Sequence, residues 1–133
     1  MITNRFNNKD DKQNLLLIIV SAILFYGNEV MKLKIKIPYI GYLLKNHYND
    51  FLGGISFIAL VNVILLFSKY NKIKKLKHIL IIGLICSIAW ELVTPVFVSE
   101  SIGDFWDVIS YGLGFTLYWI IKRYISKDIT YKF

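Results

Sequence analysis

Four apolar stretches divide this chain, and they constrain its fold more than any other feature. They cover residues 14–30, 50–68, 79–98 and 105–121. Each is close to the roughly 20 residues that a helix needs to cross a hydrocarbon core about 30 Å thick. Hydrophobic residues make up 56% of the 133 residues, which is too apolar for a soluble domain of this size. The sequence therefore predicts a single all-α domain, a polytopic membrane protein built as a four-helix transmembrane bundle.

The first stretch has the basic lead and short apolar core of a secretory signal peptide. The residues that follow the core, 25–31 (FYGNEVM), contain no pair of small residues at the spacing that signal peptidase needs. We therefore expect this stretch to be retained as a membrane anchor.

The basic residues lie between the apolar stretches, and their distribution predicts an orientation. Three precede the first stretch, five lie between the second and the third, and four follow the last. The connection between the first and second stretches holds four basic residues, and the connection between the third and fourth holds none. Because cytoplasmic loops are enriched in lysine and arginine, we expect both termini in the cytoplasm (N-in, C-in) of a cell membrane. This topology accounts for the net charge of +7, so no nucleic-acid partner is expected.

In this orientation most acidic residues gather on the outer side. Six of the nine lie there or in the outer half of a predicted span: Glu29, Asp50, Glu91, Glu100, Asp104 and Asp107. Lipid does not solvate an ionisable group, so an acid within a span is a candidate functional residue. Glu91 is the deepest, about 10 Å of helix rise below the outer end of its span. Glu100 is explained by a solvated loop.

The last stretch has a polar face. Residues with polar or small side chains recur at spacings of 3, 4, 3 and 4: Asp104, Asp107, Tyr111, Gly114 and Tyr118. These spacings place them along one side of a helix, which we expect to face the bundle. We also expect close helix approach at four glycines, namely Gly53, Gly54, Gly112 and Gly114.

These residues predict an outward-facing acidic pocket. Glu91, Asp104 and Asp107 form its core and are the candidate metal ligands, with Asp50 in support and Tyr111 as a hydrogen-bond donor. Oxygen ligands suit hard cations, so a divalent ion such as Mg²⁺ is the candidate cofactor. In the alternative interpretation, Asp50, Asp104 and Asp107 only cap helices, and Glu91 makes a helix–helix hydrogen bond. His47 is either a ligand or proton carrier, or a side chain at the membrane interface.

Other chemistries find no support in the sequence. Cys86 is the only cysteine, so no intrachain disulfide can form. Zinc-binding spacings, phosphate-binding loops and dinucleotide-binding motifs are absent from the sequence. No catalytic residue is predicted.

Three segments carry a resemblance to a known family: Trp90–Glu91 with Pro95, Asp104–Val108, and Tyr111–Gly114. They resemble the VanZ-like group of small bacterial membrane proteins, and more closely short membrane proteins labelled magnesium citrate secondary transporters. In the latter, an acidic pair starts the second span, and here Asn49 and Asp50 stand at that place. Phe105 stands where they often have proline. The resemblance implies a bacterial cell membrane and a site at these acids.

The sequence leaves several functions open. The favoured one is binding of a cation, a proton or a polar cell-envelope ligand, linked to transport or to envelope resistance. The expected partners are the lipid bilayer and this small ligand, and an oligomer is compatible with the sequence. A second candidate is a structural or assembly protein whose acids only cap helices. A third is an intramembrane hydrolase with a metal-activated water, for which no nucleophile–base pair is evident.

Overall fold

The computed structural model describes residues 9–97, 105–125 and 127–133, which fold almost entirely into helices. The elements are α1 (Lys9–Met31), α2 (Pro38–Asn46), α3 (Tyr48–Leu65), α4 (Leu76–Phe97), α5 (Phe105–Ile120) and a π-helical turn, η2 (Ile121–Ile125). Within these ranges no strand forms, and Lys75 and Lys132 pair as an isolated bridge. The predicted all-α class is confirmed.

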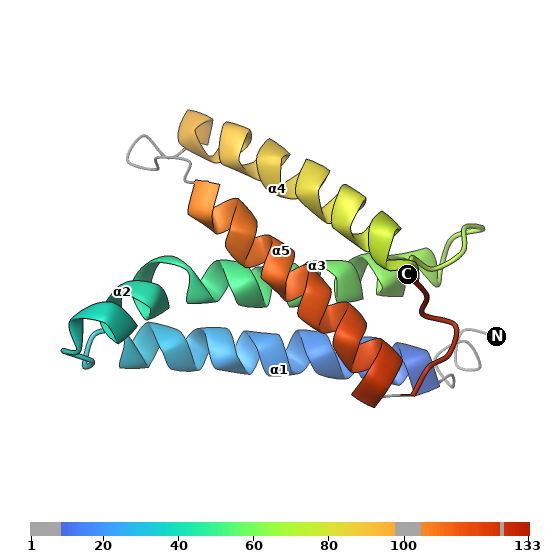
Figure 1. Ribbon diagram of the computed structural model, residues 1–133, viewed down its shortest axis with the longest axis horizontal. Coiled ribbons are helices and arrows are strands. Elements are labelled where there is room, and N and C mark those ends of the chain that lie inside the picture. The colour runs from blue at the N-terminus through green and yellow to red at the C-terminus, as the bar shows by residue number, and fades with distance from the viewer. Residues whose placement is uncertain (1–8, 98–104, 126) are drawn as a thin grey trace.

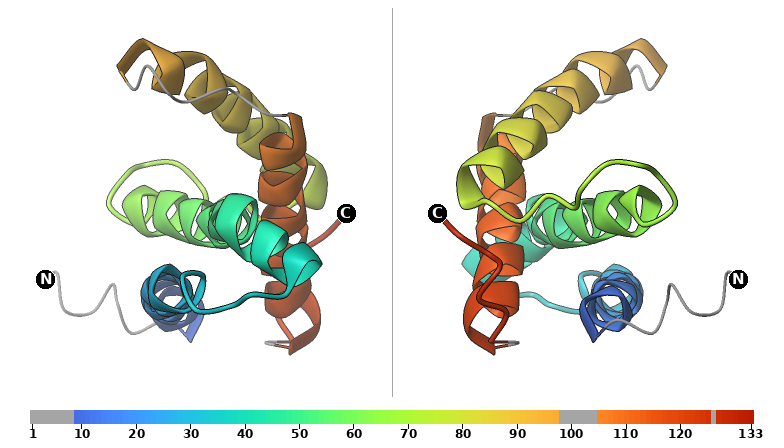
Figure 2. Two further views of the ribbon diagram at one scale, coloured as in Figure 1. Left: turned by 90° about the vertical axis from the view of Figure 1, so that its left-hand side faces the viewer. Right: turned by 90° about the vertical axis from the view of Figure 1, so that its right-hand side faces the viewer.

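The helices run back and forth between two ends of the molecule. Helices α1 and α3 lie side by side and antiparallel, and α5 crosses α3 in close contact (Figure 1). Helix α4 packs chiefly on α5 and diverges from α3 toward its own C-terminal end (Figures 1 and 2). The start of α1, the α3–α4 connection and the C-terminal residues gather at one end, here named the terminal end. Helix α2 and the starts of α3 and α5 lie at the other, here named the far end.

Three helical segments are long and apolar enough to cross a membrane. They are Lys9–Met31, the combined α2–α3 segment Pro38–Leu65, and Leu76–Val93. Helix α5 has 16 residues, which corresponds to about 24 Å of helix. The length and composition of the helices thus support a membrane protein, and a fourth span at α5 stays a prediction.

Helix α1 turns its polar side chains inward. All of its buried residues are polar, and they are Asp10, Asp11, Asn14, Ser21 and Asn28. Asn14, Ser21 and Asn28 recur at every seventh position, a spacing that returns to the same face of a helix after two turns. Most large apolar residues of α1 are exposed, for example Ile19 and Ile23 by 56% and 65%, whereas Leu17 and Ile18 pack against the core. A soluble helix has the opposite arrangement, so this surface suits contact with lipid.

Two glycines bring α3 and α5 together. A Cβ added to Gly54 would collide with the Tyr111 carbonyl oxygen, and one added to Gly114 would collide with the Phe51 carbonyl oxygen. The two backbones therefore approach more closely than any larger residue would allow. A Cβ on Gly53 would meet only the Tyr111 ring, at 3.1 Å. The prediction for Gly112 was wrong, because nothing lies within 4 Å of its Cβ position.

Buried and partly buried polar side chains form a cluster at the terminal end, here named the terminal-end cluster: Asp10, Asp11, Asn14, Asn62, Lys72, Tyr118, Lys122 and Tyr131. Lys72 donates hydrogen bonds to Asp10, at 2.9 Å, and to Asp11. Lys122, which is fully buried, pairs with Asp10. Two ammonium groups thus meet two carboxylates, and the formal charges of the cluster balance. Breaking such a buried pair leaves an uncompensated charge.

The C-terminal residues cover this cluster. Tyr131 is fully buried, with its hydroxyl 3.0 Å from that of Tyr118. The Lys132 amide donates to the Lys74 carbonyl at 3.3 Å, and the Lys132 carbonyl accepts from the Leu76 amide at 2.8 Å. These contacts hold the C-terminal residues against the start of α4.

Candidate functional site

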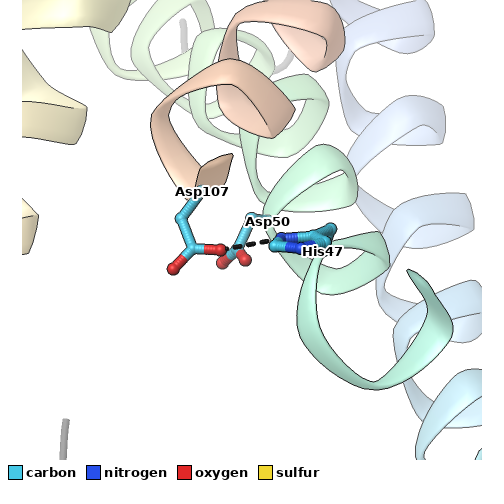
Figure 3. A group of neighbouring side chains, drawn as sticks. All are labelled: His47, Asp50 and Asp107. Atoms are coloured by element: carbon cyan, nitrogen blue, oxygen red, sulfur yellow. Dashed lines mark hydrogen bonds and ion pairs between the residues drawn. The ribbon is translucent and has the colours of Figure 1, made fainter. Parts of the chain in front are cut away.

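The corner between α2 and α3 positions two candidate ligands at the far end. His47 separates the two helices, and its backbone (φ −124°, ψ −21°) departs from helical geometry. Its ring packs edge-on against Tyr42, with centroids 5.4 Å apart. Asp50 follows in the first turn of α3. His47 and Asp50 are three residues apart, which is close to one helical turn. The imidazole and the carboxylate therefore lie on the same side of the corner (Figure 3).

A chain of polar side chains ties this corner to α1. The Asn28 amide donates to the Leu44 carbonyl at 2.8 Å and to Asn49 Oδ1 at 2.9 Å. Asn49 in turn donates to Glu29 Oε1 at 2.7 Å, and Lys32 donates to the same oxygen at 2.5 Å. Glu29 is therefore paired with a lysine and serves to hold the corner in place.

Helix α5 brings the second carboxylate to the site. Asp107 lies in its first turn, and Asp107 Oδ1 is 3.0 Å from His47 Nδ1. One ligand atom each from His47, Asp50 and Asp107 lies within 4.8 Å of the others. Figure 3 shows the three side chains pointing toward one another from α5 and from the α2–α3 corner. This grouping of three potential metal ligands comes from segments 60 residues apart.

Two further residues, Tyr111 and Glu91, interact with members of this group. Tyr111, one turn after Asp107, interacts with Asp50 through its hydroxyl. Glu91 is partly buried in α4, and its charge acts on both Asp50 and Tyr111. The pocket thus draws on three helices. Asp104 and Glu100 lie outside the described residues.

Two cavities adjoin the pocket. One of about 460 Å³ is bordered by α1, α3, α4 and α5 and is lined by Asp50, Trp90 and Tyr111 among others. A second, of about 200 Å³, lies between α3, α4 and α5 and is lined by Cys86, Ser87 and Phe115 together with Trp90 and Tyr111. Asp50 and Tyr111 are therefore accessible to a small ligand from within the bundle.

Two acids of the pocket, Asp50 and Asp107, have no lysine or arginine partner among the residues that the structure describes. Asp107 pairs with His47 instead. Elsewhere in those ranges, Asp10, Asp11, Glu29 and Asp128 each pair with a lysine. Neighbouring carboxylates in a medium of low dielectric constant repel each other unless a proton or a cation lies between them. The arrangement is therefore suited to binding a positive charge.

The structure brings together three of the five site residues predicted from the sequence, namely Asp50, Asp107 and Tyr111, with Glu91 beside them. It adds His47, for which the sequence left an interfacial role open. The only signal for His47 was its position three residues before Asp50, one helical turn away. The buried acids and lysines of the terminal end were not predicted.

No protein-family model, curated protein or solved structure matches this chain. The VanZ-like resemblance therefore stays a prediction.

Proposed function

We propose that this chain is a small multi-pass protein of the bacterial cell membrane that binds a divalent cation in the far-end pocket. The observation that carries the proposal is the contrast between this pair of acids and the other paired carboxylates. Asp10, Asp11, Glu29 and Asp128 each pair with a lysine, whereas Asp50 and Asp107 converge without one among the described residues. A divalent cation would supply the missing positive charge.

In the proposed topology, α1, α3, α4 and α5 are the four spans, and the far end faces the outside. The start of α1 and the C-terminal residues both lie at the terminal end, which supports an even number of spans (Figure 1). Most of the lysines and arginines also belong to the terminal end, and such residues favour the cytoplasm. The pocket would then take its ligand from the cell exterior or from the outer leaflet.

The resemblance to VanZ-like proteins and to the short proteins labelled magnesium citrate secondary transporters is compatible with this proposal. Glu91, Asp107 and Tyr111, which carry part of the resemblance, all belong to the far-end pocket. Whether the protein acts in transport or in envelope resistance would depend on which second ligand binds together with the cation.

The test is a calorimetric titration of the purified protein in lipid nanodiscs with Mg²⁺, Ca²⁺, Mn²⁺ and Zn²⁺ separately. We expect saturable binding of at least one ion, which is lost in Asp50→Asn and Asp107→Asn. Asp128→Asn is the matched control, because Asp128 pairs with Lys74 at the terminal end. If the wild-type protein binds none of the four ions, the proposal is wrong.

A structural function is the second candidate, and the position of the acids favours it. Asp50 and Asp107 both lie in the first turn of a helix, where a negative charge stabilises the free amide groups and the helix dipole. If this is their only function, each asparagine variant will lose about 0.3–1 kcal/mol of stability. No cation will then raise the unfolding temperature of the wild type.

A further inference from the structure

The identity of the ligand atoms in the far-end pocket distinguishes between classes of cation. Two are carboxylate oxygens, from Asp50 and Asp107, and the third is an imidazole nitrogen, His47 Nδ1. Magnesium and calcium prefer oxygen ligands alone. Imidazole nitrogen suits zinc, iron, nickel and copper, and the mixed set of imidazole and carboxylate is typical of transition-metal sites.

The spacing of two of these atoms fits direct coordination. A metal–nitrogen or metal–oxygen bond to such an ion is about 2.1 Å, so two ligands at right angles lie about 3 Å apart. The distance from His47 Nδ1 to Asp107 Oδ1 is 3.0 Å. An ion could therefore replace the hydrogen between these atoms without moving either residue far. The third ligand atom, from Asp50, lies within 4.8 Å of both. Coordination by all three would require the Asp50 side chain to change its rotamer.

The charges also match a dication. Two carboxylates and one neutral imidazole carry a formal charge of −2, which a divalent ion cancels. Asp50 and Asp107 have no lysine or arginine partner within the described ranges, so no internal cation competes for this position. The side chains of His47 and Asp107 are 12% and 20% exposed, which leaves coordination positions open to water or to a small ligand.

We propose that His47, Asp50 and Asp107 form a three-ligand site for a first-row transition-metal dication, such as Zn²⁺, Fe²⁺ or Mn²⁺. This inference rests on the proposed function and narrows its ligand from any divalent cation to a metal that accepts nitrogen. The predicted Mg²⁺ rested on the carboxylates of Glu91, Asp104 and Asp107, whereas His47 adds a nitrogen ligand.

The experiment compares Zn²⁺, Co²⁺ and Mg²⁺ binding to the full chain in nanodiscs, with the visible absorption of Co²⁺ as a report on its ligands. We expect His47→Gln to weaken Co²⁺ and Zn²⁺ binding by roughly 100-fold or more and to abolish the Co²⁺ spectrum. His78→Gln is the matched control, because His78 is the only other histidine and is exposed at the start of α4. This control should bind both metals as the wild type does.

A second measurement does not require the His47→Gln variant to fold. It is X-ray absorption spectroscopy of the wild type and of His78→Gln, both loaded with Zn²⁺. Imidazole coordination has a characteristic outer-shell scattering pattern, which we expect in both samples. Its absence from either sample would overturn the inference.

The outcomes separate the two proposals. If Mg²⁺ binds as tightly as Zn²⁺, and His47→Gln binds both unchanged, the transition-metal site is wrong and the cation pocket stands. If none of the divalent ions tested binds, both proposals fail. Equal loss of binding in His47→Gln and His78→Gln would also reject the three-ligand site.

Discussion

The side chains of Asn62 and Tyr118, 56 residues apart in the chain, form a 2.9 Å hydrogen bond inside the terminal-end cluster. The Asn62 amide also donates to the Ile73 carbonyl at 3.0 Å and accepts from the Ile73 amide at 2.7 Å. The Tyr118 hydroxyl donates to Asn14 Oδ1 at 2.8 Å. These two side chains therefore join α1, α3, α5 and the α3–α4 connection.

Tyr118→Phe should destabilise the protein by about 1–3 kcal/mol, because it removes the hydroxyl and leaves Asn62 and Asn14 short of a buried partner. Thermal unfolding in detergent micelles measures the effect. Tyr124→Phe is the control, since Tyr124 is 58% exposed. Equal stability of the two variants would show that the hydroxyl of Tyr118 contributes nothing to the fold.

Gly114→Ala should cost about 1–3 kcal/mol, because its Cβ would press on the Phe51 carbonyl and on Gly54. Gly112→Ala lies on the same helix and has open space at its Cβ position, so it should be neutral or gain up to about 1 kcal/mol from helix propensity. Chemical denaturation of both variants gives the comparison. Similar losses in both would argue against close packing of α3 on α5.

Lys72 should stabilise the fold from neutral pH up to strongly alkaline pH. Burial alone would lower the pKa of its ammonium, but the hydrogen bonds and charges of Asp11 and Asp10 outweigh burial and hold the pKa above the ordinary lysine value of 10.5. A raised pKa means that the stabilisation is complete below 10.5 and is lost as the pH rises through the folded-state value.

The unfolding temperatures of wild type and Lys72→Met, followed from pH 7 to pH 12, test this prediction. We expect a difference equivalent to about 3 kcal/mol near neutral pH, because the buried Asp11 loses its cation. The difference should shrink only at the alkaline end. Lys69→Met is the control, because Lys69 is exposed and no ion pair involves it among the described residues. A difference that disappears below pH 10 would contradict the prediction.

The proposed topology predicts which ends of the molecule a membrane-impermeant maleimide reaches in intact cells. In a Cys86→Ser background, Lys34→Cys at the far end should react from outside, and Lys69→Cys at the terminal end should react only after the cells are permeabilised. Labelling of Lys69→Cys in intact cells would place the terminal end outside and reverse the orientation.

The sequence predicted the helices well because the long apolar stretches admit few alternatives. The 14–30, 50–68, 79–98 and 105–121 stretches fall on α1, α3, α4 and α5, with ends that differ by several residues. Helix α2 was not foreseen, because its nine residues are too few to form a span. Helix periodicity also placed Asp107 and Tyr111 on one face, since that relation depends only on spacing within one helix.

Relations between helices were harder to predict. The place of His47 in the site depends on a non-helical corner and on the crossing of α3 and α5, neither of which local spacing determines. The burial of Asp10 and Asp11 was not predicted either, because their partner Lys72 lies in a connection whose path the sequence does not determine. The seven-residue spacing of Asn14, Ser21 and Asn28 was an available signal for the inward face of α1.

The inward polar face of α1 also determines how this helix is aligned with its neighbours. Lipid tails are as apolar as the side chains of Leu, Ile and Val. The apolar outer face of α1 therefore has the same free energy in lipid whichever way the helix is rotated about its axis. Asn14, Ser21 and Asn28 remove that freedom, because any large rotation would bring all three into contact with lipid. Aliphatic residues on the outer face are then interchangeable in size and order, while the amide and hydroxyl groups specify the fold. In a water-soluble protein the roles are usually reversed: the apolar residues specify the fold and the polar residues are interchangeable.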